Sequence, residues 1–165
     1  RVVSAAGSIV LSVDVRASTE AVFAAAVDWV GHDRWMLLTS VDPTRGSGDA
    51  PGDELRAVTG PRLRRRAGRR ASRIGLVDTM VIEQWEPPRR AVVRHTGLVV
   101  RGVGEFAVAA RADGTCVFVW SERLLLPLGP LGRLAWPLIR PVARAALGLS
   151  LRRFARWAPS ASVGA

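Results

Sequence analysis

The change of pattern in the last third of the chain constrains the fold most. A strand pattern that runs to about Glu122 gives way to one long apolar segment, residues 131–157, studded with arginine. A helix that closes a chain made mostly of strands must bury one side on the sheet that those strands form. The sequence therefore predicts an α+β fold, and its length suits one domain over residues 1–165.

Alternating apolar residues and turn residues predict the other elements. A helix is expected to begin after the cap residue Ser18 and to end near Trp29. A turn that is helical in part should follow it, at residues 31–35. Strands are expected at residues 8–15, 36–42, 53–59, 77–85, 91–96, 99–110 and 116–124.

The turn between the last two strands decides which side chains share a face. A three-residue loop with Gly114 in the left-handed conformation places Phe106 and Val108 on the same face as Phe118 and Trp120. A two-residue loop would turn one pair to the opposite face, and the larger apolar face favours the first register.

The final helix, 131–157, contains Pro137 and Pro141, which predict a kink. Its inward stripe is expected at steps of three and four residues. The members of this stripe are Leu134, Leu138, Val142, Ala145 and Leu149.

The net charge of +10 arises from arginine alone, since the chain has no lysine. Asparagine and tyrosine are also absent, so a G/C-rich genome explains much of the excess without an anionic partner. Residues 61–75 carry seven arginines and no acid, which predicts an exposed loop. The alternative is a patch for anionic lipid; nucleic acid is disfavoured because no aromatic residue is interleaved for stacking.

Several classes of site are disfavoured. Cys116 is the single cysteine, which excludes an internal disulfide, suits a cytoplasmic protein and is interpreted as a buried strand residue. The apolar stretch 124–139 is broken by three prolines and Arg133, so it is a poor membrane span. No phosphate loop, nucleophile elbow or metal motif is present, and we expect neither cofactor nor metal.

Two ionisable residues are expected to point into an apolar enclosure. His95 shares a strand face with Ala91 and Val93, and Glu122 shares one with Phe118 and Trp120. Buried ionisable groups are unfavourable unless they are paired or used. A structural pair, or a carboxylate at the solvated rim, is the simpler interpretation, and hydrogen bonding or proton transfer to a ligand is the functional one.

A series of short motifs, in a fixed order along the chain, carries a resemblance to a known family. The motifs are Val13-Asp14-Val15, residues 18–29 with Trp35, Gly52-Asp53, residues 81–90 with Glu86-Pro87-Pro88-Arg89-Arg90, Asp113-Gly114-Thr115, Trp120-Ser121-Glu122 and the closing helix. Through them the chain resembles the START-like superfamily, also called SRPBCC or the polyketide cyclase/dehydrase and lipid transport family. The resemblance covers nearly the whole chain, and two features depart from it: the arginine-rich insertion at 61–75 and the prolines of the last helix.

The resemblance implies a helix-grip fold, in which a curved antiparallel sheet of six to seven strands wraps around the C-terminal helix and leaves a hydrophobic cavity. It implies no shared catalytic set. The first functional hypothesis is binding of a lipid, sterol or polyketide-like molecule. The expected ligand-binding residues are Trp29, His32, Trp35, Val93, Phe106, Val108, Phe118, Trp120, Leu134 and Leu138.

Two alternatives stay open. One is a cyclase or dehydratase in which His95 or Glu122 acts as general acid or base. The other is a protein that contacts an anionic membrane through the arginine segment 61–75 and the basic outer side of the last helix. The sequence predicts no oligomeric state.

Overall fold

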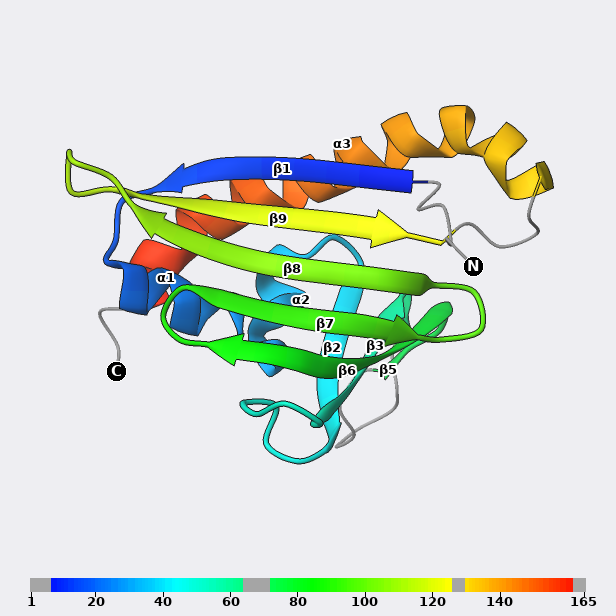
Figure 1. Ribbon diagram of the computed structural model, residues 1–165, viewed down its shortest axis with the longest axis horizontal. Coiled ribbons are helices and arrows are strands. Elements are labelled where there is room, and N and C mark those ends of the chain that lie inside the picture. The colour runs from blue at the N-terminus through cyan, green and yellow to red at the C-terminus, as the bar shows by residue number, and fades with distance from the viewer. Residues whose placement is uncertain (1–6, 64–71, 126–129, 162–165) are drawn as a thin grey trace.

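A seven-stranded antiparallel sheet forms the body of the computed structural model, which describes residues 7–63, 72–125 and 130–161. The strand order is β1-β9-β8-β7-β6-β3-β2, and the sheet curves beneath a long helix (Figure 1). Its strands are β1 (Gly7–Val15), β2 (Thr39–Arg45), β3 (Glu54–Thr59), β6 (Leu76–Glu86), β7 (Arg90–Thr96), β8 (Arg101–Ala110) and β9 (Cys116–Leu124). This arrangement confirms the predicted helix-grip architecture.

Short helices fill the inner side of the sheet. The helix α1 (Thr19–Ala26) begins at Ser18, whose hydroxyl accepts a hydrogen bond from the Ala21 N–H at 3.2 Å, as its role as N-cap predicts. A 3-10 turn (Trp29–Gly31) and the one-turn helix α2 (His32–Trp35) follow. They pack against β2 and the last helix, which places Trp29 and His32 on the inner side of the sheet.

The predicted register of the last two strands is confirmed. Gly114 has φ of 78°, and the Arg111 N–H donates to the Thr115 carbonyl at 2.8 Å. Phe106 therefore lies opposite Trp120, as predicted. Glycine is favoured at residue 114 because other L-residues rarely adopt this conformation.

The helix α3 (Pro130–Ala161) closes the fold with the second half of its length. There Phe154 is fully buried, and its ring centroid lies 4.6 Å from that of Phe118 and 5.0 Å from that of Trp35. Leu151 and Ala158 are buried beside it. These contacts join the helix, the sheet and α2 into one core.

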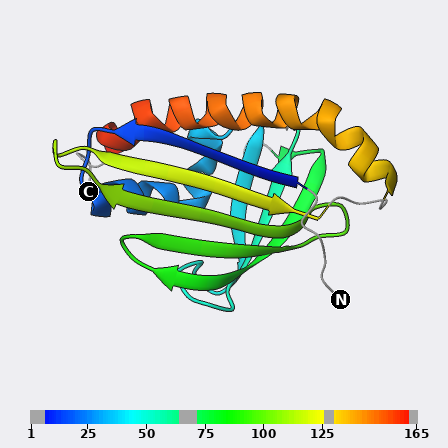
Figure 2. The same ribbon diagram turned by 45° about the horizontal axis from the view of Figure 1, so that its top comes forward.

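The predicted inward stripe of α3 is wrong. Leu134 and Leu138 are 76% and 78% exposed, and Val142, Ala145 and Leu149 are exposed as well. A helix of 32 residues is about 48 Å long, whereas the nine-residue strand β1 spans only about 30 Å, so much of the first half of the helix lacks a sheet to cover it. This half contains Pro137 and Pro141, and the helix bends toward its N-terminal end (Figure 2).

Exposure at the described ends of the arginine segment agrees with the prediction for 61–75, since Pro61, Arg62, Ile74 and Gly75 are exposed. The prediction of a loop is wrong there, because these ends form two short strands. β4 (Arg62–Leu63) pairs with β5 (Ser72–Arg73). Arg62 forms an ion pair with Asp33, and Arg73 donates to the Gly60 carbonyl at 2.8 Å. Residues 64–71 of the segment lie outside the described residues.

The apolar stretch 124–139 was predicted to be a poor membrane span. In the described part of the chain, no helix combines the length and the apolar character needed to cross a bilayer.

We expect Phe154→Ala to lower the free energy of unfolding by about 3–5 kcal/mol, because it removes a ring buried among three others. Leu138→Ala is the matched control on the same helix, and its effect should stay within about 0.5 kcal/mol. Urea denaturation of both variants measures the difference. Equal destabilisation by the two substitutions would contradict the observed orientation of α3.

Candidate functional site

An internal cavity of about 150 Å³ lies between the sheet and the segment that contains the 3-10 turn and α2. Most of its wall is apolar. It reaches solvent near the exposed residues Thr59 and Leu76. The residues that line it are Trp29, His32, Met36, Thr39, Val41, Ala57, Thr59, Leu76, Asp78, Met80, Ala91, Val93, His95, Val100, Gly104, Glu105, Phe106, Trp120 and Glu122.

The predicted site residues fall into three groups. The first group lines the cavity: Trp29, His32, Val93, His95, Phe106, Trp120 and Glu122. Trp35, Val108 and Phe118 are buried in the core behind the wall. Leu134 and Leu138 were predicted to face the cavity, and this prediction is wrong because both are exposed on α3.

Phe106 is the centre of the aromatic wall. Its ring centroid lies 5.4 Å from that of Trp120 in an edge-to-face arrangement and 6.2 Å from that of Trp29 in a stacked one. The His32 ring lies 6.0 Å away. Edge-to-face and offset contacts of this kind are favourable beyond their buried area, so this wall is firmly packed.

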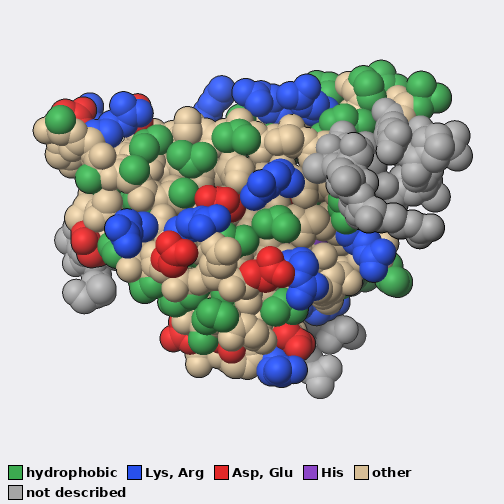
Figure 3. Space-filling view, viewed as in Figure 1, with side chains coloured by type: hydrophobic (Ala, Val, Ile, Leu, Met, Phe, Trp, Pro, Cys, Tyr) green, Lys and Arg blue, Asp and Glu red, His purple; other side chains and the backbone are tan. Residues whose placement is uncertain are grey.

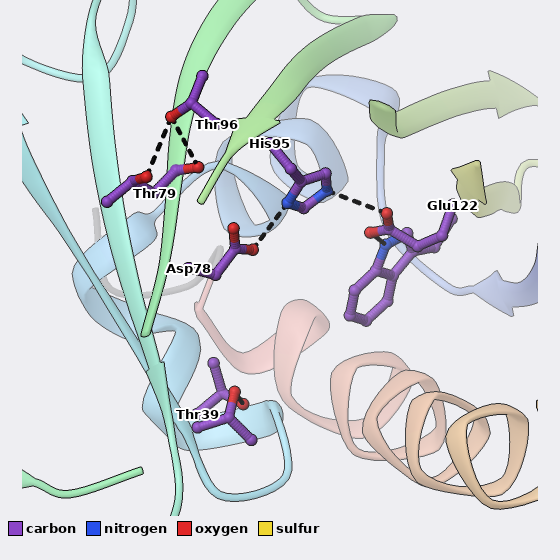
Figure 4. A network of polar contacts seen from close by, with 8 residues as sticks. Thr39, Asp78, Thr79, His95, Thr96 and Glu122 are labelled. Carbon is purple, nitrogen blue, oxygen red and sulfur yellow. Dashed lines mark hydrogen bonds and ion pairs between the residues drawn. The ribbon is translucent and has the colours of Figure 1, made fainter. Parts of the chain in front are cut away.

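A polar cluster of Asp78, His95 and Glu122 forms the polar end of the cavity lining. Figure 4 shows the imidazole of His95 between the two carboxylates. His95 Nδ1 lies 2.7 Å from Asp78 Oδ2, and His95 Nε2 lies 3.1 Å from Glu122 Oε2. The Trp120 N–H donates to Glu122 Oε1 at 2.7 Å, which fixes that carboxylate. The imidazole is thus held between two carboxylates that come from different strands.

The absence of a side chain at Gly104 leaves space for this cluster. A Cβ at residue 104 would lie 3.0 Å from Glu122 Oε1 and 3.1 Å from His95 Nε2. Those distances are tighter than ordinary van der Waals contact. A side chain at residue 104 would therefore press on the pair formed by His95 and Glu122.

His95 is protonated at neutral pH. Burial lowers its pKa, but the hydrogen bonds to Asp78 and Glu122, together with the negative charges of these groups, outweigh burial and raise the pKa from 6.5 to about 10. The protonated ring donates both of its N–H groups, one to each carboxylate. The pairing of His95 with Glu122 agrees with the simpler interpretation of the sequence, that of a structural pair.

His32 behaves in the opposite way. Burial lowers its pKa from 6.5 to about 4, so the ring is neutral at neutral pH. Its Nε2 lies 2.8 Å from the Ala26 carbonyl, which only accepts, so Nε2 carries the proton. The other nitrogen, Nδ1, is then a buried acceptor, and no described residue forms a hydrogen bond with it.

Asp78 is the functional candidate that sequence reasoning missed. It lies on the inner face of β6, two residues before Met80, which is paired with His95. The alternation Asp78, Met80, Ile82 within the predicted strand 77–85 was the signal that could have identified it. Its second oxygen, Oδ1, is buried and has no hydrogen-bond partner within the described part of the chain.

No group of three metal-binding side chains arranged to hold an ion occurs within residues 7–63, 72–125 and 130–161. In the polar cluster both imidazole nitrogens are already engaged by carboxylates. A metal would have to displace one of these hydrogen bonds, so the cluster does not fit a metal centre.

A family model described as polyketide cyclase/dehydrase and lipid transport matches residues 6–158. Among solved structures, a crystal structure from Thermus thermophilus has a TM-score of 0.70 at 15% identity, over 94% of this chain and 99% of that one. A solution structure from Thermobifida fusca has a TM-score of 0.62 at 20% identity, over 90% and 93%. At these identities the likeness shows the fold alone. The comparison with curated proteins found no match.

We expect the free energy of unfolding to fall as the pH rises from 6.5 to 10, because His95 has a higher pKa in the folded protein than in the unfolded chain. The stabilisation is complete below about pH 6.5 and is lost as the pH approaches 10. The loss should be on the order of a few kcal/mol. With no lysine or tyrosine, Cys116 is the other side chain that titrates across this range, and His32 contributes only at its lower limit, where the unfolded chain still binds a proton on that ring.

The measurement is urea denaturation of Cys116→Ala across this pH range, with His95→Gln in the same background as the comparison. The His95→Gln protein should be less stable at pH 6.5 and should vary less with pH. If the stability of Cys116→Ala does not change over the range, the assignment of a raised pKa to His95 is wrong.

Proposed function

The chain belongs to the polyketide cyclase/dehydrase and lipid transport family, and on this premise we propose that it binds a hydrophobic or amphipathic small molecule in the cavity beneath the sheet. The observation that carries the proposal is the combination of an apolar aromatic wall with a compact polar cluster at one end. Small-molecule sites are typically apolar with a few convergent polar groups.

The size of the cavity limits what it encloses. An engineered cavity of about 150 Å³ holds benzene, and pockets for larger ligands span about 300–1,000 Å³. At about 150 Å³ the present cavity fits one ring or a short chain. A longer ligand would place its remainder outside, past Thr59 and Leu76, and a sterol would fit inside only if the walls moved apart.

The polar cluster supports a binding role more than an acid–base role. A general base needs a free lone pair, and a general acid needs a proton directed at the substrate. Both His95 nitrogens face carboxylates, and Glu122 accepts from Trp120 and His95. In this arrangement His95 has no free nitrogen for proton transfer, and each oxygen of Glu122 already accepts one hydrogen bond, so the cyclase or dehydratase alternative has less support.

Filling the cavity should abolish binding. Val93→Phe adds a ring to the wall, whereas Val103→Phe adds the same ring on the opposite face of the sheet and serves as the matched control. We expect mass spectrometry of natively purified protein to detect a small organic molecule with the wild type and Val103→Phe, and at least about tenfold less with Val93→Phe. Equal amounts from both variants would count against the cavity as the site.

Contact with an anionic membrane is a second candidate function, supported by the surface of α3. The exposed side chains Leu134, Leu138 and Val142 lie on a helix that also presents exposed arginines and has no acidic residue. Arginine side chains gather along the edge formed by α3, and hydrophobic ones gather at its N-terminal end (Figure 3). Apolar and basic surface on one helix is typical of interfacial binding.

We expect the protein to sediment with vesicles that contain phosphatidylglycerol and to be released by high salt. Leu134→Asp combined with Leu138→Asp should reduce the bound fraction severalfold, because charge replaces the apolar contact. Val10→Asp, at an exposed residue of β1, is the control. Absence of sedimentation at low salt would rule out this candidate.

A further inference from the structure

The polar end of the cavity holds an excess of negative charge. Two carboxylates, Asp78 and Glu122, face one imidazole, that of His95. The sum is negative whether the ring carries one proton or two. A ligand whose polar group reaches this end therefore meets a negative field inside a largely apolar enclosure, where charges interact strongly.

Among the described residues, the cavity wall offers no free cation to balance an anionic ligand. None of the described residues that line it is an arginine. The one positive group is the His95 ring, and its two nitrogens are already directed at Asp78 and Glu122. A carboxylate or phosphate placed here would lose its hydration and gain no free donor from the ring, which is strongly unfavourable.

The unused polar atoms of the wall are acceptors. Of the buried side-chain atoms without a hydrogen-bond partner among the described residues, two belong to cavity-lining residues: Asp78 Oδ1 and His32 Nδ1. His32 is 1% exposed, so solvent does not satisfy its nitrogen. Buried polar atoms normally have partners, so two unpaired acceptors on residues that line the same cavity favour a ligand that supplies donors.

We propose that the cavity selects amphiphiles whose polar end donates hydrogen bonds, as a hydroxyl or an ammonium group does, and excludes those that end in a carboxylate or phosphate. This inference rests on the proposed function, because it assigns the chemical class of the ligand at the same site. The donor would reach Asp78 Oδ1, and the apolar body would lie against Phe106 and Trp120.

The test uses four probes that share one phenylpropyl body: phenylpropanol, phenylpropylamine, phenylpropionate and the methyl ether of phenylpropanol. Dissociation constants are measured by calorimetry near neutral pH. We expect the alcohol and the amine to bind at least about tenfold more tightly than the propionate, because a buried anion would lack a partner. The ether, which donates no hydrogen bond, should bind severalfold more weakly than the alcohol.

Variants identify the groups that are responsible. Asp78→Asn removes one negative charge and supplies an amide donor, so the ratio of the propionate and alcohol dissociation constants should fall by about tenfold. Glu122→Gln is a second variant with the same expected direction, in case Asp78→Asn does not fold. Asp42→Asn removes an exposed acid of β2 outside the cavity and should leave the ratio unchanged.

The possible outcomes separate the inference from the function on which it rests. If the four probes bind equally, or if the propionate binds most tightly, the selection for donors is wrong and the cavity remains a binding site. If none of the four binds to the wild-type protein, the proposed function itself fails for ligands of this size, and the inference fails with it. A ratio that shifts equally in Asp42→Asn would refute the role of Asp78.

Discussion

The contact between α3 and the aromatic core is the interaction on which the rest of the structure depends. The concave face of the curved sheet is apolar, and the fold is unstable unless a second layer covers this face. Phe154 provides that cover by packing on Phe118 from the sheet and on Trp35 from α2. Because the Phe154 ring contacts both the sheet and α2, it sets the spacing between α3 and these two elements. The cavity lies beside this contact, where the layers are not filled.

The polar cluster shows how charge is accommodated in that unfilled space. An isolated carboxylate in such a place would be strongly disfavoured, and so would an isolated imidazolium. Asp78, His95 and Glu122 stabilise one another through hydrogen bonds that span β6, β7 and β9, and the indole of Trp120 holds the last of the three. The protein thus has a basic exterior, with a net charge of +10, around a cavity with an acidic end.

The fold and part of the site were predictable from sequence because they follow from local patterns. The turn at Gly114 predicted that Phe106 and Trp120 lie on the same face of the sheet. The alternation of side chains along the strands placed His95 and Glu122 on the inner face. The alternation of Asp78 with Met80 and Ile82 indicates which face of the strand Asp78 is on. Its approach to His95 was missed because it also depends on the register of β6 with β7, which shifts between Ile82 and Gln84. An irregularity of this kind leaves no clear mark in the residues themselves.

The prediction of which side of α3 faces inward was wrong for a different reason. Apolar residues occur on several sides of its first half, so helical spacing alone allows more than one inward stripe, and the choice depends on where the sheet ends. Leu134 and Leu138 have regular helical spacing, but both are exposed to solvent. Phe154, in contrast, packs against Phe118 of the sheet. Only the three-dimensional length of the sheet separates these two possibilities.

The hydrogen bond between Trp120 and Glu122 also makes the site visible to spectroscopy. Indole emission depends on the polarity of its surroundings, and of the six tryptophans two, Trp29 and Trp120, lie on the cavity wall. A ligand that enters would replace solvent beside both rings and change the charge distribution around the Trp120 N–H. The protein therefore carries its own optical reporter of occupancy, and no dye needs to be attached near the cavity.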